Sequence, residues 1–157
     1  MKAPKLTAFL LSLPLLFLVS CKSTEEVEKD NIYYGTALPM SSSQETPSFS
    51  STATGSVDAT YNRLTKTLAY KITFSGLSGN ATAAHIHGLG EAGVAASVVQ
   101  TFNGFPAAAA GTYSGTLLVD GVKIKEEDIL AGRYYANIHT AAKPAGEIRG
   151  QLVLTKK

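Results

Sequence analysis

The chain has 157 residues, of which 45% are hydrophobic and 17% are charged. This length supports one hydrophobic core and is short for two. Two of its fourteen Lys and Arg residues, Lys2 and Lys5, lie in an apolar leader, so twelve basic residues balance twelve acidic ones in the remainder. That balance argues against a nucleic-acid partner, because nucleic-acid binding needs a basic patch or stripe.

The first twenty residues are predicted to be a signal peptide. MKAPKLTAFLLSLPLLFLVS begins with basic residues, continues with an apolar run and ends in the small Ser20 before the only cysteine, Cys21. The apolar run is about a dozen residues long, shorter than the roughly 20 that a helix needs to cross a bilayer. Residues Leu18–Cys21 resemble the bacterial lipobox, which implies cleavage before Cys21 and a diacylglycerol group on its sulfur.

This leader predicts a lipid-anchored protein of the bacterial cell envelope, held to the membrane by acyl chains. Lys22 occupies the position where an aspartate retains lipoproteins at the inner membrane in some bacteria, which favours the outer membrane and leaves the leaflet open. The acidic run within residues 21–31 cannot bury enough apolar area to fold. It therefore predicts a flexible tether, followed by one domain at residues 32–155.

Short strands separated by Gly- and Ser-rich breaks predict an all-β fold. In TKTLAYKITF, Leu68, Tyr70, Ile72 and Phe74 alternate with polar or small residues at the period of a half-buried strand. KEEDIL at 125–130 predicts a short helical connector, because Ala-Gly follows it. We expect an antiparallel β-sandwich or barrel. The other strands are expected at 32–38, 56–61, 83–87, 97–102, 113–119, 133–139 and 147–154, and two loops at 39–55 and 103–111.

All three histidines lie in two compact motifs, AHIHG and NIHT. Residues i and i+2 of a strand share a face, so Ile86 and Ile138 are expected to enter the core. His85, His87 and His139 then lie together on the opposite, polar face. Imidazoles so placed can reach one ion, and the pattern predicts a shared three-histidine site.

The segment after His139 is expected to bring polar partners to this site. TAAKPAG predicts a hairpin-sized loop, and pairing across it places Glu147 or Arg149 beside His139 on the outer face, which Asn137 shares. A carboxylate next to an imidazole can orient the ring or share a cation. Glu147 is therefore a candidate additional ligand, and Asn137 and Arg149 are candidate binding or network residues.

Three motifs in this order resemble the CHRD domain family: HIHG at 85–88, GRYYANIHT at 132–140 and PAGEIRGQL at 144–152. The resemblance implies an immunoglobulin-like β-sandwich or barrel with distant similarity to copper,zinc superoxide dismutase. It implies no catalytic residue, and because animal members bind growth factors outside cells, it implies a binding module. The chain departs from the dismutase pattern, since a dinuclear site needs several more histidines than the three present.

Three interpretations remain open. The first is a copper- or zinc-binding site of the three histidines, completed by Glu147 or water, with dismutase-like redox chemistry as its less favoured extension. The second, which we favour, is a non-enzymatic envelope module that binds an extracellular protein or polymer through its loops, since no nucleophile is paired with a base. The third is structural: Glu147 and Arg149 tie strands together in a polar network buried beneath the 39–55 loop.

Overall fold

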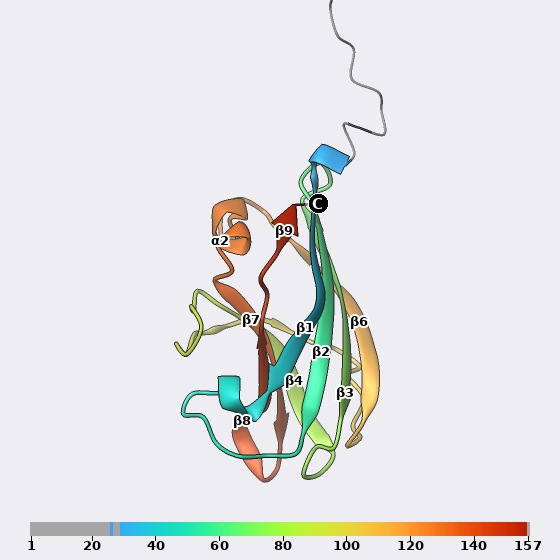
Figure 1. Cartoon of the computed structure of the whole chain (residues 1–157), viewed down its shortest axis with the longest axis vertical. Coiled ribbons are helices and arrows are strands. Elements are labelled where there is room, and N and C mark those ends of the chain that lie inside the picture. Colours follow the sequence, from blue (N-terminus) through green and yellow to red (C-terminus); the bar gives the residue numbers. More distant parts are fainter. Residues whose placement is uncertain (1–25, 27–28, 157) are drawn as a thin grey trace, which may run out of the picture.

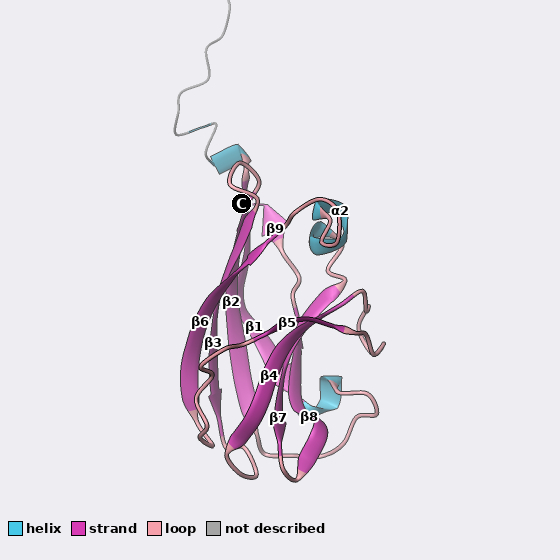
Figure 2. Cartoon of the chain, turned by 180° about the vertical axis from the view of Figure 1, so that it is seen from behind, coloured by secondary structure: helices cyan, strands magenta, loops and turns pink. Residues whose placement is uncertain are grey.

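The structure is a computed structural model that describes residue 26 and residues 29–156, so the predicted signal peptide, Cys21 and most of the predicted tether lie outside the described residues. Within this part the chain is almost entirely antiparallel β, as expected, and curves into a nearly closed barrel (Figures 1 and 2). The strands are β1 (Ile32–Ser41), β2 (Thr54–Asn62), β3 (Thr67–Ser75), β4 (Ala81–Gly88), β5 (Val98–Thr101), β6 (Gly111–Leu118), β7 (Tyr134–Thr140), β8 (Lys143–Gln151) and β9 (Thr155–Lys156).

Short helical elements accompany these strands: the 3-10 turn η1 (Ser42–Gln44), the helix α2 (Glu126–Leu130) and helical residues Lys29 and Asp30 before β1. Helix α2 is the connector that the sequence predicts. The described residues contain no helix that is long and apolar enough to span a membrane.

The barrel closes through side chains at one seam. The strand order is β5-β4-β7-β8-β1-β2-β3-β6, with β9 added beside β1. At the two ends of this order, Gln100 of β5 donates from Nε2 to the carbonyl oxygen of Thr116 of β6 over 2.8 Å. The Tyr70 hydroxyl of β3 donates to Oε1 of the same glutamine over 2.9 Å. A single amide therefore joins the first and last strands of the sheet.

Apolar side chains fill the barrel interior with the predicted alternation. Leu68 and Ile72 of β3 are 0% exposed, and Ile86 and Ile138 of β4 and β7 are 1% and 0% exposed. Burial of such a side chain contributes about 1.5–3 kcal/mol. The prediction that the two isoleucines enter the core is confirmed, and it fixes the opposite face of β4 and β7 as the one that carries the histidines.

Strand β8 begins four residues earlier than the sequence predicts. The turn consists of Ala141 and Ala142 alone, and Thr140 already pairs with Lys143, so Pro144 lies within a strand. A register shift between Ile138 and Thr140 accommodates the missing amide hydrogen of the proline. The consequence is that the carbonyl oxygen of Pro144 lies beside His139.

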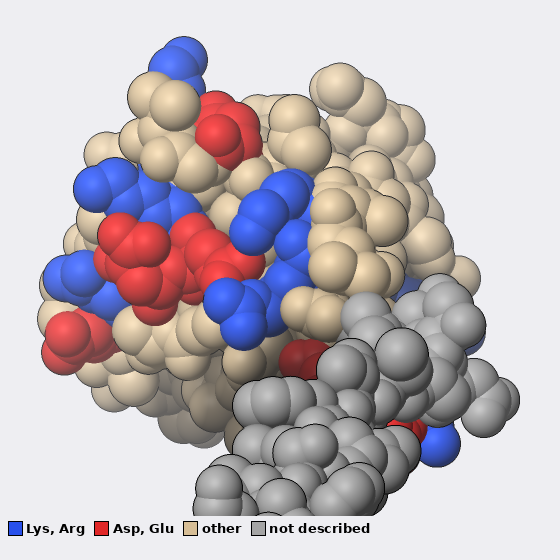
Figure 3. Space-filling view, turned by 90° about the horizontal axis from the view of Figure 1, so that it is seen from above, with Lys and Arg blue, Asp and Glu red and all other residues tan. Residues whose placement is uncertain are grey.

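Charged side chains of both signs interleave at the pole that carries α2 (Figure 3). The carboxylate of Glu126 accepts from the Tyr61 hydroxyl at 2.8 Å, from Arg63 at 2.7 Å and from Lys66 at 2.9 Å. Burial alone would raise the pKa of Glu126, but the hydrogen bonds from Lys66, Tyr61 and Arg63 outweigh it and hold the pKa at about 2. The helix is therefore fastened to the β2–β3 hairpin.

Replacing Glu126 by alanine is expected to destabilise the fold by about 1–3 kcal/mol, because the buried Tyr61 hydroxyl loses its acceptor. Urea unfolding at pH 7 measures the loss. The exposed neighbour Glu127 provides a matched control, since Glu127→Ala is expected to change the free energy of unfolding by less than about 0.5 kcal/mol. Equal losses in the two variants would contradict this account of Glu126.

Candidate functional site

The three histidines converge on one location at the outer face of the sheet. His85 and His87 come from β4, and His139 comes from the neighbouring β7, where it pairs with Ala83. Each ring offers one nitrogen, and the three nitrogens all lie within 4.8 Å of one another. The prediction that the three imidazoles share a location is confirmed.

Backbone carbonyls orient two of the rings. Nδ1 of His139 lies 3.0 Å from the carbonyl oxygen of Pro144, and Nδ1 of His87 lies 2.8 Å from that of Ala96. A carbonyl oxygen only accepts, so Nδ1 carries the proton in both rings and Nε2 keeps its lone pair. Nε2 of His87 is buried and has no hydrogen-bond partner. His85 presents its Nδ1 to Nε2 of His139 at 2.9 Å and donates to it.

The spacing of these nitrogens is close to that of a metal site. Zinc–nitrogen bonds of 2.0–2.1 Å in tetrahedral geometry place ligand nitrogens about 3.3 Å apart. The observed separations run from 2.9 Å between His85 and His139 up to at most 4.8 Å. An ion bound by all three nitrogens would replace the hydrogen bond between His85 and His139, so His85 would carry its proton on Nε2 and coordinate through Nδ1.

The surroundings favour neutral rings, which is the form of imidazole that binds metals. Burial lowers the pKa of His85, and its neighbours His139 and His87 lower it further. Burial also lowers the pKa of His139, although the hydrogen bond to the Pro144 carbonyl opposes that shift. Two of the three rings are thereby kept in the deprotonated state near neutral pH.

Tyr135 links the histidines to the buried part of the sheet. Its ring stacks on His87 with centroids 4.9 Å apart and planes 2° from parallel. Its hydroxyl accepts from the Ala96 amide at 3.1 Å, and the carbonyl of that same residue accepts from His87. The guanidinium of Arg149 lies 3.4 Å from the centre of the tyrosine ring. Tyr135 was not predicted as a site residue, although the GRYYANIHT motif contains it.

The polar face beyond the histidines is covered, whereas the sequence analysis placed it at the outer surface. Asn137, Glu147 and Arg149 are 2%, 0% and 1% exposed. They point away from the barrel interior, as their alternation with Ile138 and Ile148 requires. Two long loops, residues 42–53 and 89–97, fold over them and exclude water.

Glu147 does not belong to the histidine group. Its carboxylate accepts from the Ser78 amide at 2.8 Å and hydroxyl at 2.7 Å, and from the hydroxyls of Thr140 at 2.7 Å and Ser51 at 3.3 Å. Burial would raise the pKa of Glu147, but the hydrogen bonds from Thr140 and Ser78 outweigh it and hold the pKa below its usual value. These contacts match the interpretation of a buried network that ties the 39–55 loop to the sheet.

Arg149 holds the second loop in place. Its terminal nitrogens donate to the carbonyl oxygens of Val94 and Glu91 and to the side chain of Gln151, each over 2.9 Å. Its Nη1 also lies 3.4 Å from the Thr46 hydroxyl, so the two covering loops meet at this side chain. Arg149 is therefore a network residue, as one of the sequence interpretations expected.

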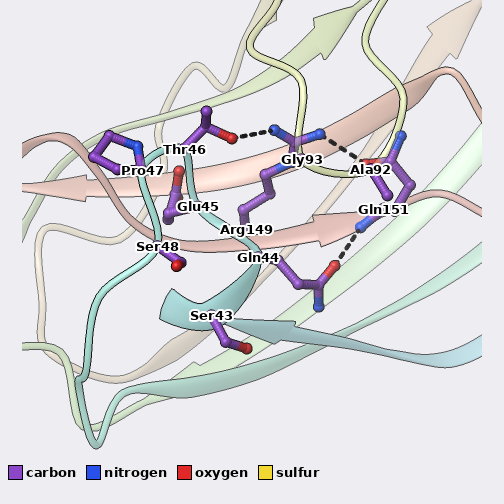
Figure 4. Close-up of a pocket in the computed structure, with 10 residues that line it drawn as sticks. All are labelled: Ser43, Gln44, Glu45, Thr46, Pro47, Ser48, Ala92, Gly93, Arg149 and Gln151. Atoms are coloured by element: carbon purple, nitrogen blue, oxygen red, sulfur yellow. Dashed lines mark hydrogen bonds between the residues drawn. The ribbon is translucent and has the colours of Figure 1, made fainter.

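A cavity of about 380 Å³ lies between η1 with its following loop and the tip of the 89–97 loop (Figure 4). Glu45, which the sequence analysis missed, lines this cavity and is only 9% exposed. Burial raises the pKa of Glu45 to about 7, although Arg149 and Asn137 act in the opposite direction. No periodic pattern marks a lone carboxylate in a Ser/Thr-rich loop, so only the folded chain reveals it.

The fold and this site define an all-β domain with a histidine cluster on the outer face of a barrel. The family model of the CHRD domain matches residues 36–152, and the chain therefore belongs to the CHRD domain family. The three histidines, Asn137, Glu147 and Arg149 all lie within the matched span. Comparison with curated proteins and with solved structures finds no match, so the distant likeness to copper,zinc superoxide dismutase stays an expectation.

Glu45 is expected to make the protein less stable as the pH rises. Its pKa of about 7 in the folded chain lies above the ordinary value of 4.5, so folding favours the protonated form. This contribution is complete below pH 4.5 and is lost as the pH rises through 7, and the full shift corresponds to about 3 kcal/mol. Urea unfolding between pH 5 and 8 measures the decline, which Glu45→Gln is expected to reduce.

The exposed Glu91 provides the control for this experiment, because Glu91→Gln removes a carboxylate from the opposite loop and is expected to keep the wild-type pH dependence. The histidines, whose pKa values are lowered, add a pH dependence of opposite sign, so the comparison between variants is decisive: an equal pH dependence in wild type and Glu45→Gln would refute the assignment.

Proposed function

We propose that this protein is a non-enzymatic binding protein of the bacterial envelope whose CHRD domain holds a copper or zinc ion through His85, His87 and His139. The observation that carries the proposal is the pair of hydrogen bonds to Ala96 and Pro144, which directs Nε2 of His87 and His139 towards the same place. Such bonds to the second ring nitrogen are the usual way in which a protein fixes a metal-binding histidine.

The donor set determines the class of metal. Three imidazoles without a thiolate or carboxylate suit zinc and copper, and Cu(II) binds such nitrogen ligands more tightly than zinc does. The oxygens of Glu147 are occupied by Ser51, Ser78 and Thr140, so a water or an external ligand is the natural fourth donor.

The number of histidines limits the chemistry of the site. A second metal ion would need further imidazole ligands, and all three histidines of the chain are already in the group. A single bound ion with one open position supports ligand binding or metal storage directly. It supports the two-metal arrangement of a dismutase poorly.

Replacing both His85 and His87 by alanine is expected to lower the affinity for Cu(II) and zinc by more than about 100-fold. Mutation of residues that only hydrogen-bond to metal ligands already lowers metal affinity about 10–100-fold, and this variant removes two ligands. Isothermal titration of the purified protein measures this effect. Nitrogen hyperfine couplings in the Cu(II) electron paramagnetic resonance spectrum would report directly on imidazole coordination.

The matched control for the titration is Thr82→Ala, which removes an exposed side chain from the same strand and is expected to leave metal binding unchanged. Uptake by the double histidine variant at the wild-type affinity would refute the metal site.

We further propose that Cys21 carries the lipid that attaches the protein to the envelope, on the support of the Leu18–Cys21 motif and the apolar run before it. Cys21→Ser is expected to abolish incorporation of a clickable fatty acid in bacterial cells and to move the protein from the membrane to the soluble fraction. Ser23→Ala, two residues away, is the control and is expected to label normally. A labelled Cys21→Ser variant would disprove the anchor.

A further inference from the structure

We propose that the cavity beneath η1 is a second binding site, which takes a neutral, hydroxyl-rich ligand such as a sugar unit and bonds it through Glu45 and Arg149. The two residues come from different elements that line the cavity. Glu45 follows η1, and Arg149 lies on β8 at its floor (Figure 4). This proposal rests on observations that do not involve the histidines.

The cavity has the size and the lining of a small-molecule site. Its volume of about 380 Å³ falls within the range of about 300–1,000 Å³ that is typical of ligand pockets. Hydroxyl and amide side chains make up half of the ten residues that line it. The side chains that line it come from Ser43, Gln44, Glu45, Thr46, Pro47, Ser48, Ala92, Arg149 and Gln151, together with Gly93.

Buried polar atoms at this cavity lack partners in the described part of the protein. Oε1 of Glu45 and Nε of Arg149 are both buried without a hydrogen bond, and so is Oδ1 of the adjoining Asn137. Buried polar atoms are nearly always bonded, because an unmade bond costs about 1–3 kcal/mol. Asn137 and the Thr46 backbone also bond the Glu45 carboxyl, so an occupant of the cavity would complete the bonding of Oε1 of Glu45 and of Nε of Arg149, whose residues both line it.

The backbone of β8 makes room for the buried carboxylate. A Cβ atom at Gly146 would lie 2.5 Å from Oε1 of Glu45 and 2.8 Å from Nδ2 of Asn137. Gly146 also has a φ of +134°, a value that residues with a Cβ rarely adopt. Only glycine meets both constraints, and its lack of a side chain leaves space for the Glu45 carboxylate against β8.

The unpartnered atoms determine the chemistry of the ligand. Oε1 of Glu45 accepts, and Nε of Arg149 donates. The terminal nitrogens of Arg149 are occupied by Val94, Glu91 and Gln151, so no free guanidinium fork remains for an anion. A hydroxyl group both donates and accepts, and it therefore satisfies both atoms.

Charge also favours a neutral ligand. Glu45 and Arg149 bring opposite charges to the cavity, so an anionic ligand would face the carboxylate and a cationic one the guanidinium. Because burial raises the pKa of Glu45 to about 7, its carboxyl group can exchange the role of acceptor for that of donor near neutral pH. Both forms suit a hydroxyl.

The test applies the purified protein to an array of immobilised oligosaccharides. One part of the array carries neutral hexose and N-acetylhexosamine chains, and the other carries sulfated or sialylated chains. We expect binding to neutral chains and a loss of at least about 10-fold in Glu45→Ala. Ala92→Phe, at an exposed position on the rim, is expected to block the cavity with all its polar groups intact. Urea unfolding of both variants checks that they fold.

Two control variants separate this site from its surroundings. Glu127→Gln, on the exposed side of α2, and His85→Ala, whose ring bonds His139 and not the 89–97 loop, are both expected to retain saccharide binding. The second control also distinguishes the failure of this inference from the failure of the metal proposal. Absence of binding to every neutral chain, preference for the acidic chains, or equal binding by wild type, Glu45→Ala and Ala92→Phe would each overturn the inference.

Discussion

The outer face of the sheet depends on the hydrogen bonds and ring contact of one buried group, the guanidinium of Arg149. The side chain is 1% exposed, donates to the carbonyls of Glu91 and Val94 and lies over the ring of Tyr135. A hydrogen bond that involves a charged group contributes about 1.5–3 kcal/mol, so the loop that supplies these carbonyls is held strongly. That loop also provides the Ala96 carbonyl that orients His87. One charge therefore supports both the histidine cluster and the Glu45 cavity.

The sequence was sufficient to predict the fold class and the meeting of the histidines. The fold class and the face on which each histidine lies follow from the two-residue period of a β-strand, which needs no knowledge of distant contacts. Because Ile86 and Ile138 are apolar and flanked by polar residues, the side of each strand that faces the core was determined locally. The motif resemblance also indicated the correct family. The pairing of β4 with β7 then brought together rings that lie 54 residues apart in the chain.

The covering of this face could not be predicted in the same way. The loops at 42–53 and 89–97 have no periodic pattern, and their positions depend on contacts such as Thr46 with Arg149, which are 103 residues apart. Without those contacts a polar strand face predicts an exposed surface, so the burial of Asn137 was missed, and that of Glu147 and Arg149 was expected in only one of the three open interpretations. The early start of β8 was missed because proline and glycine usually indicate a turn. Here a register shift accommodates them within the strand.

The positions of the chain ends distinguish the two poles of the barrel. β9 lies beside β1, and Lys156 pairs with Asp30 over 3.1 Å, so both ends of the described chain meet at one pole, whereas η1 and the adjoining cavity lie towards the other (Figure 1). The pole with η1 is therefore the one farther from the N-terminal attachment that we propose, and the recess beside η1 would stay accessible to large or insoluble polymers in the medium.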